Sequence, residues 1–242
     1  MVFDISSIAI ILGIFFLAGI AKGIIGMGLP TISLALLILV SDLSTAMLLL
    51  LGPSIITNIW QGLRGPFIQP ILMRLWPFLL SCGVAVPIGS LFLLKVDMNY
   101  LSALLGALLV GYALAEVLGF SLVISLKYEK LIGGILGSAT GLLTGMTGSC
   151  VFPGVMFLQA LKLDRNMMIQ VMGLLFTIST VALAVGLYNN RVLNLENIFW
   201  SCVGIIPSLF GMMFGRKIRL RLSEKSFKKF FFFSLLGLGI YI

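Results

Sequence analysis

The sequence has no histidine, only three cysteines and few charges, with Asp, Glu, Lys and Arg making up 10% of its 242 residues. Without imidazole, it cannot provide a histidine-ligated metal or haem, or a Ser-His-Asp or Cys-His nucleophile. The cysteines (Cys82, Cys150 and Cys202) all lie within apolar runs, where they form neither a CxxC motif nor a disulfide framework. We therefore expect no metal site, no cofactor and no enzyme activity.

Apolar residues dominate instead, at 60% of the chain with a mean hydropathy of +1.18. A soluble domain is nearer to half apolar and a quarter charged. The apolar runs are continuous rather than ten-residue alternations of inward and outward residues, which favours helices over a membrane barrel. The sequence thus predicts an all-α, multi-pass protein of the plasma or inner membrane.

Six ordinary membrane spans are predicted, at about residues 43–63, 70–94, 98–119, 166–188, 195–214 and 227–242. Two other segments, 5–40 and 131–162, are almost uncharged and do not fit this pattern. As single helices they would be about 54 and 48 Å long, against a hydrocarbon core of about 30 Å. Each is also slightly too short for two full crossings and a turn.

Both unusual segments are interrupted by glycine and proline, in GIIGMGLP at 23–30 and GLLTGMTGSCVFP at 141–153. Two half-helices that meet at a Gly-rich break explain these interruptions, either as a re-entrant loop or as a bent hairpin. Non-helical backbone at membrane depth is tolerated only where protein or a water-filled cavity covers it. The breaks therefore predict a binding site.

The net charge is +8, and seven of the sixteen basic residues lie within 215–229. We expect this stretch to be a cytoplasmic loop beside anionic lipid headgroups, and we expect no nucleic-acid partner. If both broken segments return to the side where they start, the loops hold thirteen basic residues inside and two outside. If 131–162 crosses once, the ratio is ten to five. The positive-inside rule favours the returning segments, with both termini outside, and leaves re-entrant loops and paired short crossings equally open.

The sequence also contains an internal repeat. A shift of 122 residues places GIAKGIIG (19–26) over GLLTGMTG (141–148), and Asp42 over Asp164. This predicts two repeats, 1–120 and 121–242, each with one broken segment and three spans. Because three full spans separate the two breaks, the repeats are expected to be inverted, as in many secondary transporters.

The duplicated Gly-rich breaks, each followed by proline and an apolar half-helix in a chain of this length, resemble the sulfite exporter TauE/SafE family of membrane permeases. The resemblance covers essentially the whole chain. Members of that family have a fuller GxGGG run in each half, where this chain has GMGL at 26–29 and GMTGS at 145–149. The resemblance implies transport of small sulfur-containing anions such as sulfite, thiosulfate or sulfonates.

The residues at the breaks themselves suit an anion. A helix start offers free amides and the positive end of the helix dipole, and glycine lets the backbone approach a ligand closely. The second break adds small hydroxyl and thiol donors. The candidate substrate-binding residues at the two breaks are Gly23, Gly26, Gly28 and Pro30, and Gly145, Thr147, Gly148, Ser149, Cys150 and Pro153. The same glycines are also of the kind that lets membrane helices pack closely.

Lys22 is a further candidate ligand for the anion, because it lies within an apolar stretch, where an unpaired charge costs several kcal/mol. Alternatively, it extends to the interface. Asn58 and Gln61 are three residues apart on one helix face and are candidates for lining the cavity. Glu116 is a candidate partner of Lys22 or carrier of a coupling proton, and Arg74 is a candidate for the vestibule. Both also fit as residues at the ends of their spans.

The predicted function is transport of a small anion by alternating access, in contact with the lipid bilayer. The sequence leaves the driving ion, the direction and the oligomeric state undetermined. The alternatives are an anion channel, a membrane-embedded enzyme, or a subunit with a role in assembly only.

Overall fold

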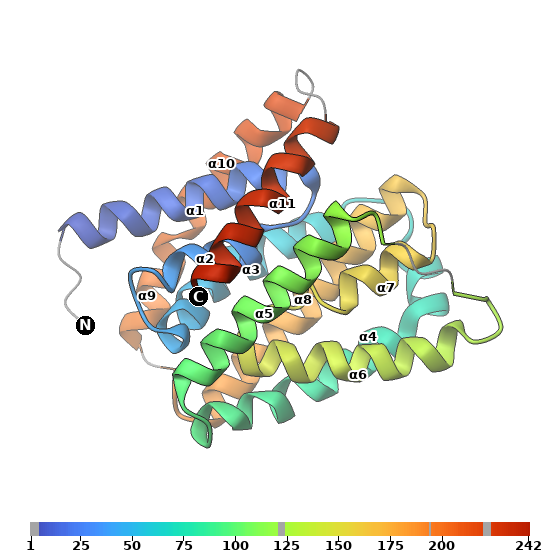
Figure 1. Ribbon diagram of the computed structural model, residues 1–242, viewed down its shortest axis with the longest axis horizontal. Helices are drawn as coiled ribbons and strands as arrows, with labels where there is room; N and C mark the ends of the chain where they lie inside the picture. Colours follow the sequence, from blue (N-terminus) through green and yellow to red (C-terminus); the bar gives the residue numbers. More distant parts are fainter. Residues whose placement is uncertain (1–4, 121–123, 194, 220–223) are drawn as a thin grey trace.

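The computed structural model describes residues 5–120, 124–193, 195–219 and 224–242, which form helices and no strand (Figure 1). This confirms the predicted all-α class. The helices are α1 Ile5–Ile25, α2 Leu29–Leu37, α3 Leu43–Leu63, α4 Ile68–Ser90, α5 Met98–Val117, α6 Glu129–Thr147, α7 Gly154–Ala160, α8 Arg165–Asn189, α9 Leu195–Val203, α10 Ile205–Arg219 and α11 Glu224–Tyr241, with a 3₁₀ turn, η1, at Leu91–Leu94. Residues 220–223 of the predicted basic loop lie outside the described residues.

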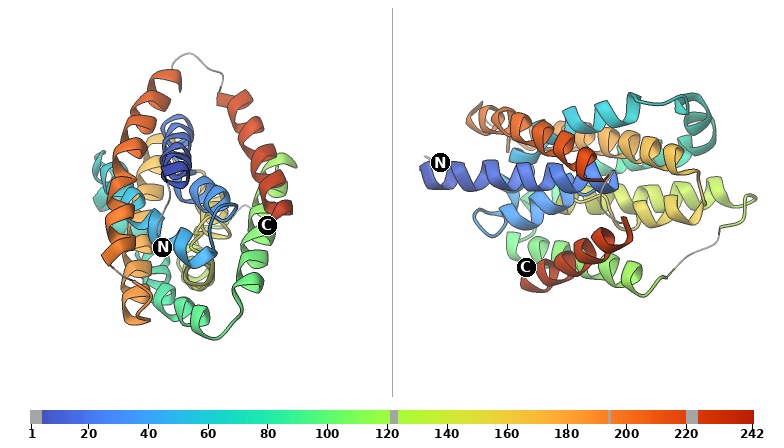
Figure 2. Two further views of the ribbon diagram at one scale, coloured as in Figure 1. Left: turned by 90° about the vertical axis from the view of Figure 1, so that its left-hand side faces the viewer. Right: turned by 90° about the horizontal axis from the view of Figure 1, so that it is seen from above.

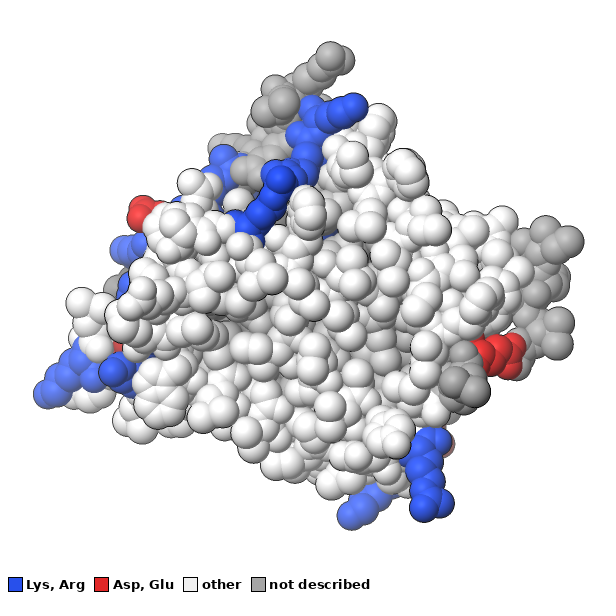
Figure 3. All heavy atoms as spheres, turned by 180° about the vertical axis from the view of Figure 1, so that it is seen from behind, with Lys and Arg blue, Asp and Glu red and all other residues white. Residues whose placement is uncertain are grey.

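Six stretches of the described chain are long and apolar enough to cross a membrane: Ser7–Ile25, Leu43–Leu63, Ile68–Leu94, Met98–Val117, Arg165–Asn189 and Glu196–Ile218. Five of them coincide with predicted ordinary spans. The other belongs to α1, which the sequence assigned to a broken segment, whereas the predicted span at 227–242 forms α11 and is not among the six. Seen from behind, a broad uncharged face separates Lys and Arg side chains at its edges, as a lipid-facing surface requires (Figure 3).

The broken segments are each a long helix followed by a short one. α1 ends at Ile25, and Gly26 and Gly28 then have φ of 89° and 107°. α6 ends at Thr147, and Gly148 follows with φ of 75°. Such left-handed backbone favours glycine, which commonly ends helices in this way. Because α2 and α7 have nine and seven residues, they are only about 14 and 11 Å long and cannot cross a core of about 30 Å alone.

Glycines let α1 pack directly on the backbone of α10. A methyl group added at Gly19 would collide with the backbone oxygen of Ser208, and one at Gly23 with that of Met212. On α10, Gly211 and Gly215 face α1 in the same way. Close contact of this kind stabilises helix pairs in membranes, where no hydrophobic effect drives helices together.

α6 packs on α4 by the same means. Methyl groups at Gly141 and Gly145 would collide with the backbone oxygens of Cys82 and Val86. A partly buried ion pair joins the same two helices, with Arg74 Nε 2.6 Å from Glu129 Oε1 and Arg74 Nη2 2.8 Å from Glu129 Oε2. Two hydrogen bonds in parallel fix this pair more firmly than one.

The remaining contacts complete the bundle. α3 packs against α8, and α5 packs against α11. Seen along the bundle, α5 and α11 lie on one side and α10 on the other, with α1 and α2 between them (Figure 2, left). The breaks themselves, at 26–28 and 148–151, are buried and so lie inside the protein rather than against lipid.

The backbone contact predicts different effects for two glycines of α6. Replacing Gly141 with Ala should destabilise the protein by about 1–3 kcal/mol, because the methyl group has backbone of α4 and Ala85 in its place. Thermal unfolding of the purified protein in detergent measures the effect.

Gly134→Ala is the matched control on the same helix, because a methyl group there meets nothing within 4 Å. It should be neutral or stabilise by up to about 1 kcal/mol, since alanine is the better helix former. Equal melting temperatures for the two variants would contradict the packing described here.

Candidate anion-binding site

A cavity of about 640 Å³ opens among the C-terminal ends of α1, α3 and α10 and the N-terminal end of α8. Three basic side chains, Lys22, Arg64 and Arg216, are among the described residues that line it. No Asp or Glu is among them. The cavity is therefore positively charged and suited to an anion.

Lys22 closes the inner end of this cavity. Its side chain is only 2% exposed, although it lies one turn before the end of a helix of the membrane-spanning class. Nζ donates to Thr57 Oγ1 at 3.0 Å and to Asn58 Oδ1, both on α3. These partners are neutral, so they solvate the ammonium group without compensating its charge. Burial of a charge under these conditions is costly unless a counter-ion binds.

Gln61 fixes the first break against the neighbouring helices. Its Nε2 donates to Gly26 O at 2.7 Å and to Ile169 O of α8 at 2.8 Å. Gln61, Gly23 and Gly26 all line the cavity. The structure thus brings Lys22, Gln61, Gly23 and Gly26 together in the cavity lining, whereas Asn58 contacts Lys22 but is not among the lining residues.

The mouth of the cavity carries Arg64 and Arg216, which are both exposed. The Arg64 guanidinium carbon lies 4.4 Å from the centre of the Trp60 ring, so the side chain is held by a cation–π contact. The turn after α3 is fixed by Gln170, whose Nε2 donates to Gly62 O and Gly65 O, each at 3.0 Å. A rigid turn keeps the Arg64 charge at the entrance.

The second break lies outside the cavity that Lys22 lines. Gly145, Thr147, Gly148, Ser149 and Cys150 are all buried, and none of them lines the cavity. Thr147 Oγ1 donates to Leu143 O at 2.7 Å within its own helix. Gly148 packs against Leu34 of α2 and Met47 of α3. This break is therefore packed with apolar neighbours and has no opening to the Lys22 cavity.

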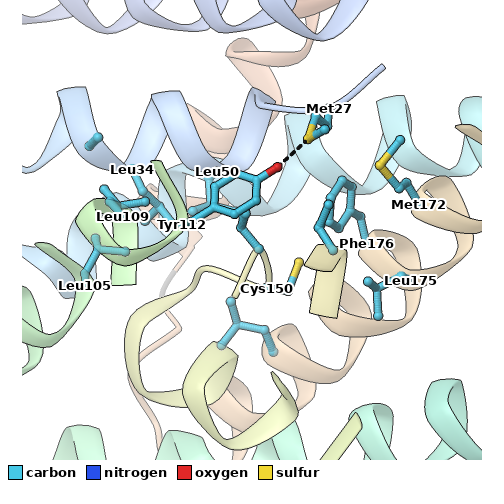
Figure 4. Packing of buried hydrophobic residues seen from close by; sticks show 14 of the residues in the cluster. Met27, Leu34, Leu50, Leu105, Leu109, Tyr112, Cys150, Met172, Leu175 and Phe176 are labelled. Carbon is cyan, nitrogen blue, oxygen red and sulfur yellow. Dashed lines mark hydrogen bonds between the residues drawn. The ribbon is translucent and has the colours of Figure 1, made fainter. Parts of the chain in front are cut away.

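The space between the two breaks is filled by apolar side chains (Figure 4). Tyr112 of α5 donates to Met27 Sδ of the first break at 3.4 Å, and Cys150 of the second break lies nearby with Phe176 of α8. All four side chains are buried. They form a cluster between the two breaks, which we call the central plug.

The half-helix starts do not line the cavity. Gly28 precedes α2 and packs against Phe231, and Pro30 is the second residue of α2 and is buried. Pro153 precedes α7, after a cis peptide bond with Phe152. The positive ends of these two helix dipoles are thus directed at the protein interior rather than at the cavity.

Glu116 and Arg74 also lie apart from Lys22. Glu116 Oε1 accepts a hydrogen bond from Gln159 Nε2 of α7. Arg74 is held by Glu129 at the α4–α6 contact and does not line the cavity. Among the described residues, Lys22 therefore has α3 amide and hydroxyl groups as its partners rather than either of these two residues.

The sequence did not single out several residues of this site, namely Thr57, Trp60, Arg64, Asn166, Gln170 and Arg216. Arg64 and Arg216 were considered only as markers of the cytoplasmic side, because both lie at the ends of spans. The one sequence signal for Gln170 is that an amide within a predicted membrane span needs hydrogen-bond partners. The structure buries this side chain near the start of α8.

A comparison with family models matched residues 11–242 to the model described as Sulfite exporter TauE/SafE. Comparisons with curated proteins and with solved structures found no match. The match covers nearly the whole chain, and the six membrane-spanning stretches agree with a multi-pass membrane protein. The chain belongs to the sulfite exporter TauE/SafE family, a family of membrane permeases for sulfur anions.

Proposed function

We propose that this protein is a permease that binds a small sulfur oxyanion, such as sulfite, thiosulfate or an organosulfonate, in the Lys22 cavity. The observation that carries this proposal is the buried ammonium group of Lys22, which has neutral partners and faces a cavity whose described lining residues include two further cations and no carboxylate. A bound anion provides the counter-charge that the site lacks.

The residues around Lys22 suit an oxyanion. Gln61 and Asn166 add amide groups to the lining, and Gly23 and Gly26 contribute backbone to it. Oxyanions with several free oxygens accept hydrogen bonds from such donors, in addition to the charge of Lys22. No catalytic acid, base or nucleophile is required for this role, so the proposed function is transport without chemistry.

The cavity supports alternating access rather than a continuous channel. It is open at the end of the bundle that carries Arg64 and Arg216, and the central plug closes the space between the two breaks. We propose that this open end faces the cytoplasm, since the loops predicted to be cytoplasmic from their basic residues meet there. A permease must expose the site to the two sides in turn, whereas a channel leaves a path across.

The helix contacts support the proposal that the two halves are inverted copies. Gly19 and Gly23 contact Ser208 and Met212 of α10, as Gly141 and Gly145 contact Cys82 and Val86 of α4. α3 packs on α8 and α5 packs on α11, which are the pairs that a twofold axis would bring together. In this arrangement the counterpart of Lys22 is Thr144, so the positive charge belongs to one half only.

Replacement of Lys22 by Met should weaken sulfite binding by about 30-fold or more, because removal of one member of a buried charge pair costs about 2–5 kcal/mol. Binding is measured by calorimetry on the purified protein, and flux in proteoliposomes. The ligand-free variant should be at least as stable as the original protein, since a buried charge has been removed.

Lys217→Met is the matched control, because Lys217 is exposed on α10 beside Arg216 and does not line the cavity. It should bind sulfite normally. Unchanged binding and flux in Lys22→Met would remove Lys22 from the mechanism and with it the proposed site.

Replacement of both Arg64 and Arg216 by Gln should weaken sulfite binding by about two- to tenfold at low salt and by less at high salt. These charges are exposed, so they attract the anion over a distance that salt shortens to about 10 Å at 0.1 M. Affinities at about 20 and 500 mM potassium gluconate measure the effect. Lys95→Gln is the control, because it changes an exposed charge beyond the far end of α4, and it should bind sulfite normally. If the Arg64→Gln/Arg216→Gln variant keeps the salt dependence of the original protein, these two residues do not attract the anion.

Counterflow separates a permease from a channel. Proteoliposomes loaded with unlabelled sulfite should accumulate labelled sulfite transiently from outside, because each inward step is coupled to the return of the loaded site. Flux that follows the electrochemical gradient alone, with no such accumulation, would favour a channel.

A further inference from the structure

Beyond Lys22, the helices α1, α3 and α10 continue side by side toward the opposite end of the bundle. The three meet at Gly204, where an added methyl group would lie 2.8 Å from the Phe15 ring and 3.1 Å from Pro53 Cγ. One turn nearer to the cavity, Gly19 faces the backbone of Ser208. This leaves a short section of the seam between the Phe15 contact and Lys22.

Three hydrogen-bonding groups in this section are buried without a partner. Ser54 Oγ, Asn58 Nδ2 and Ser208 Oγ have no hydrogen-bond partner among the described residues, and all three side chains are 0% exposed. Asn58 Oδ1 accepts from Lys22, so its amide nitrogen is the group that remains free. Ser54 lies one turn before Asn58 on α3, and Ser208 lies one turn before Met212, which lines the cavity.

Buried hydroxyls without a hydrogen-bond partner are rare among the described residues. Thr57, Thr144 and Thr180 are also buried on helices, and each donates to the carbonyl four residues earlier at 2.7 Å. Ser54 and Ser208 have the same option in their own helices but do not use it. A buried donor without an acceptor destabilises a fold, so such a group persists where another molecule satisfies it.

The corresponding place in the other half of the chain is closed. Cys82 contacts Gly141 as Ser208 contacts Gly19, and its Sγ lies 3.4 Å from Ser179 Oγ of α8. Ser179 corresponds to Thr57 through the shift of 122 residues. Cys82 and Ser179 thus satisfy one another, whereas Ser54 Oγ and Ser208 Oγ have no partner among the described residues.

We propose that Ser54, Asn58 and Ser208 form a second, occluded station for the oxyanion, one helical turn deeper than the cavity. The proposal rests on the function proposed above, because Lys22 lies between the two stations and serves both. Three neutral donors suit a compact anion with several unhindered oxygens, such as sulfite or thiosulfate, better than a halide, which lacks separate oxygen acceptors. Phe15, with Pro53 and Gly204, would close the far side of this station.

The test uses Ser54→Ala, Ser208→Ala and the double variant in the purified full-length protein. Each substitution should leave the melting temperature of the ligand-free protein unchanged or higher, because it removes a buried donor that has no partner. Each should weaken sulfite and thiosulfate binding by about threefold to tenfold, because it also removes a hydrogen bond to the ligand. Chloride binding should change less than twofold.

Ser33→Ala is the matched control. Ser33 is equally buried, but its hydroxyl donates to Leu29 O within α2, so its removal should not weaken sulfite binding. A role in structure alone would lower the melting temperature and leave the affinity unchanged, the reverse of the result expected for Ser54 and Ser208.

Lys22→Met, measured in parallel, separates the two proposals. If Lys22→Met loses sulfite binding but the Ser54→Ala/Ser208→Ala double variant binds sulfite within twofold of the original protein, the second station is wrong and the cavity site stands. If Lys22→Met binds sulfite normally, the cavity site is wrong, regardless of the result for the double variant.

Discussion

The rest of the site depends on one constraint, which is that a positive charge is buried inside a membrane protein with no carboxylate among its described partners. Lys22 is held by the hydroxyl of Thr57 and the amide of Asn58, both neutral. In hydrocarbon surroundings such a charge is tolerated only with hydration, polar partners or a counter-ion. The cavity lined by Arg64 and Arg216 supplies access for the counter-ion, and the Gly-rich end of α1 forms part of its lining.

Most of the architecture could be predicted from the sequence, because bilayer thickness limits helix length so strictly. The ends predicted for the span at 43–63 agree with α3, and both interruptions are where glycine and proline placed them. The place of the first break within the folded bundle could not be predicted. A hydropathy pattern does not show that α1 remains helical for 21 residues, so that its break lies beside Gln61 in the last turn of α3 rather than halfway along a span.

The candidate site was predictable in part, for a related reason. A charge within an apolar run stands out in a sequence, so Lys22 was found, and Asn58 and Gln61 followed from their spacing on one helix face. Arg64 and Arg216 lie at the ends of helices, where basic residues are ordinary, and only the folded chain brings them to one cavity. The second break was expected to contribute Thr147, Ser149 and Cys150, but nothing in a sequence shows whether a Gly-rich break is covered by side chains or by water, and here side chains cover it.

The glycine contacts have a consequence for how this protein can change shape. α1 belongs to the first half of the chain but rests on the backbone of α10, and α6 belongs to the second half but rests on α4. Two helices whose backbones touch cannot slide past each other through rotation of side chains, because no side chain separates them. The rigid bodies of any rearrangement are therefore mixed pairs, α1 with α10 and α4 with α6, each built from both halves of the sequence. The same holds for α3 with α8, where Gly62 meets Gly173, and for α5 with α11, where Gly106 meets Gly239, so each of the four pairs moves as one body.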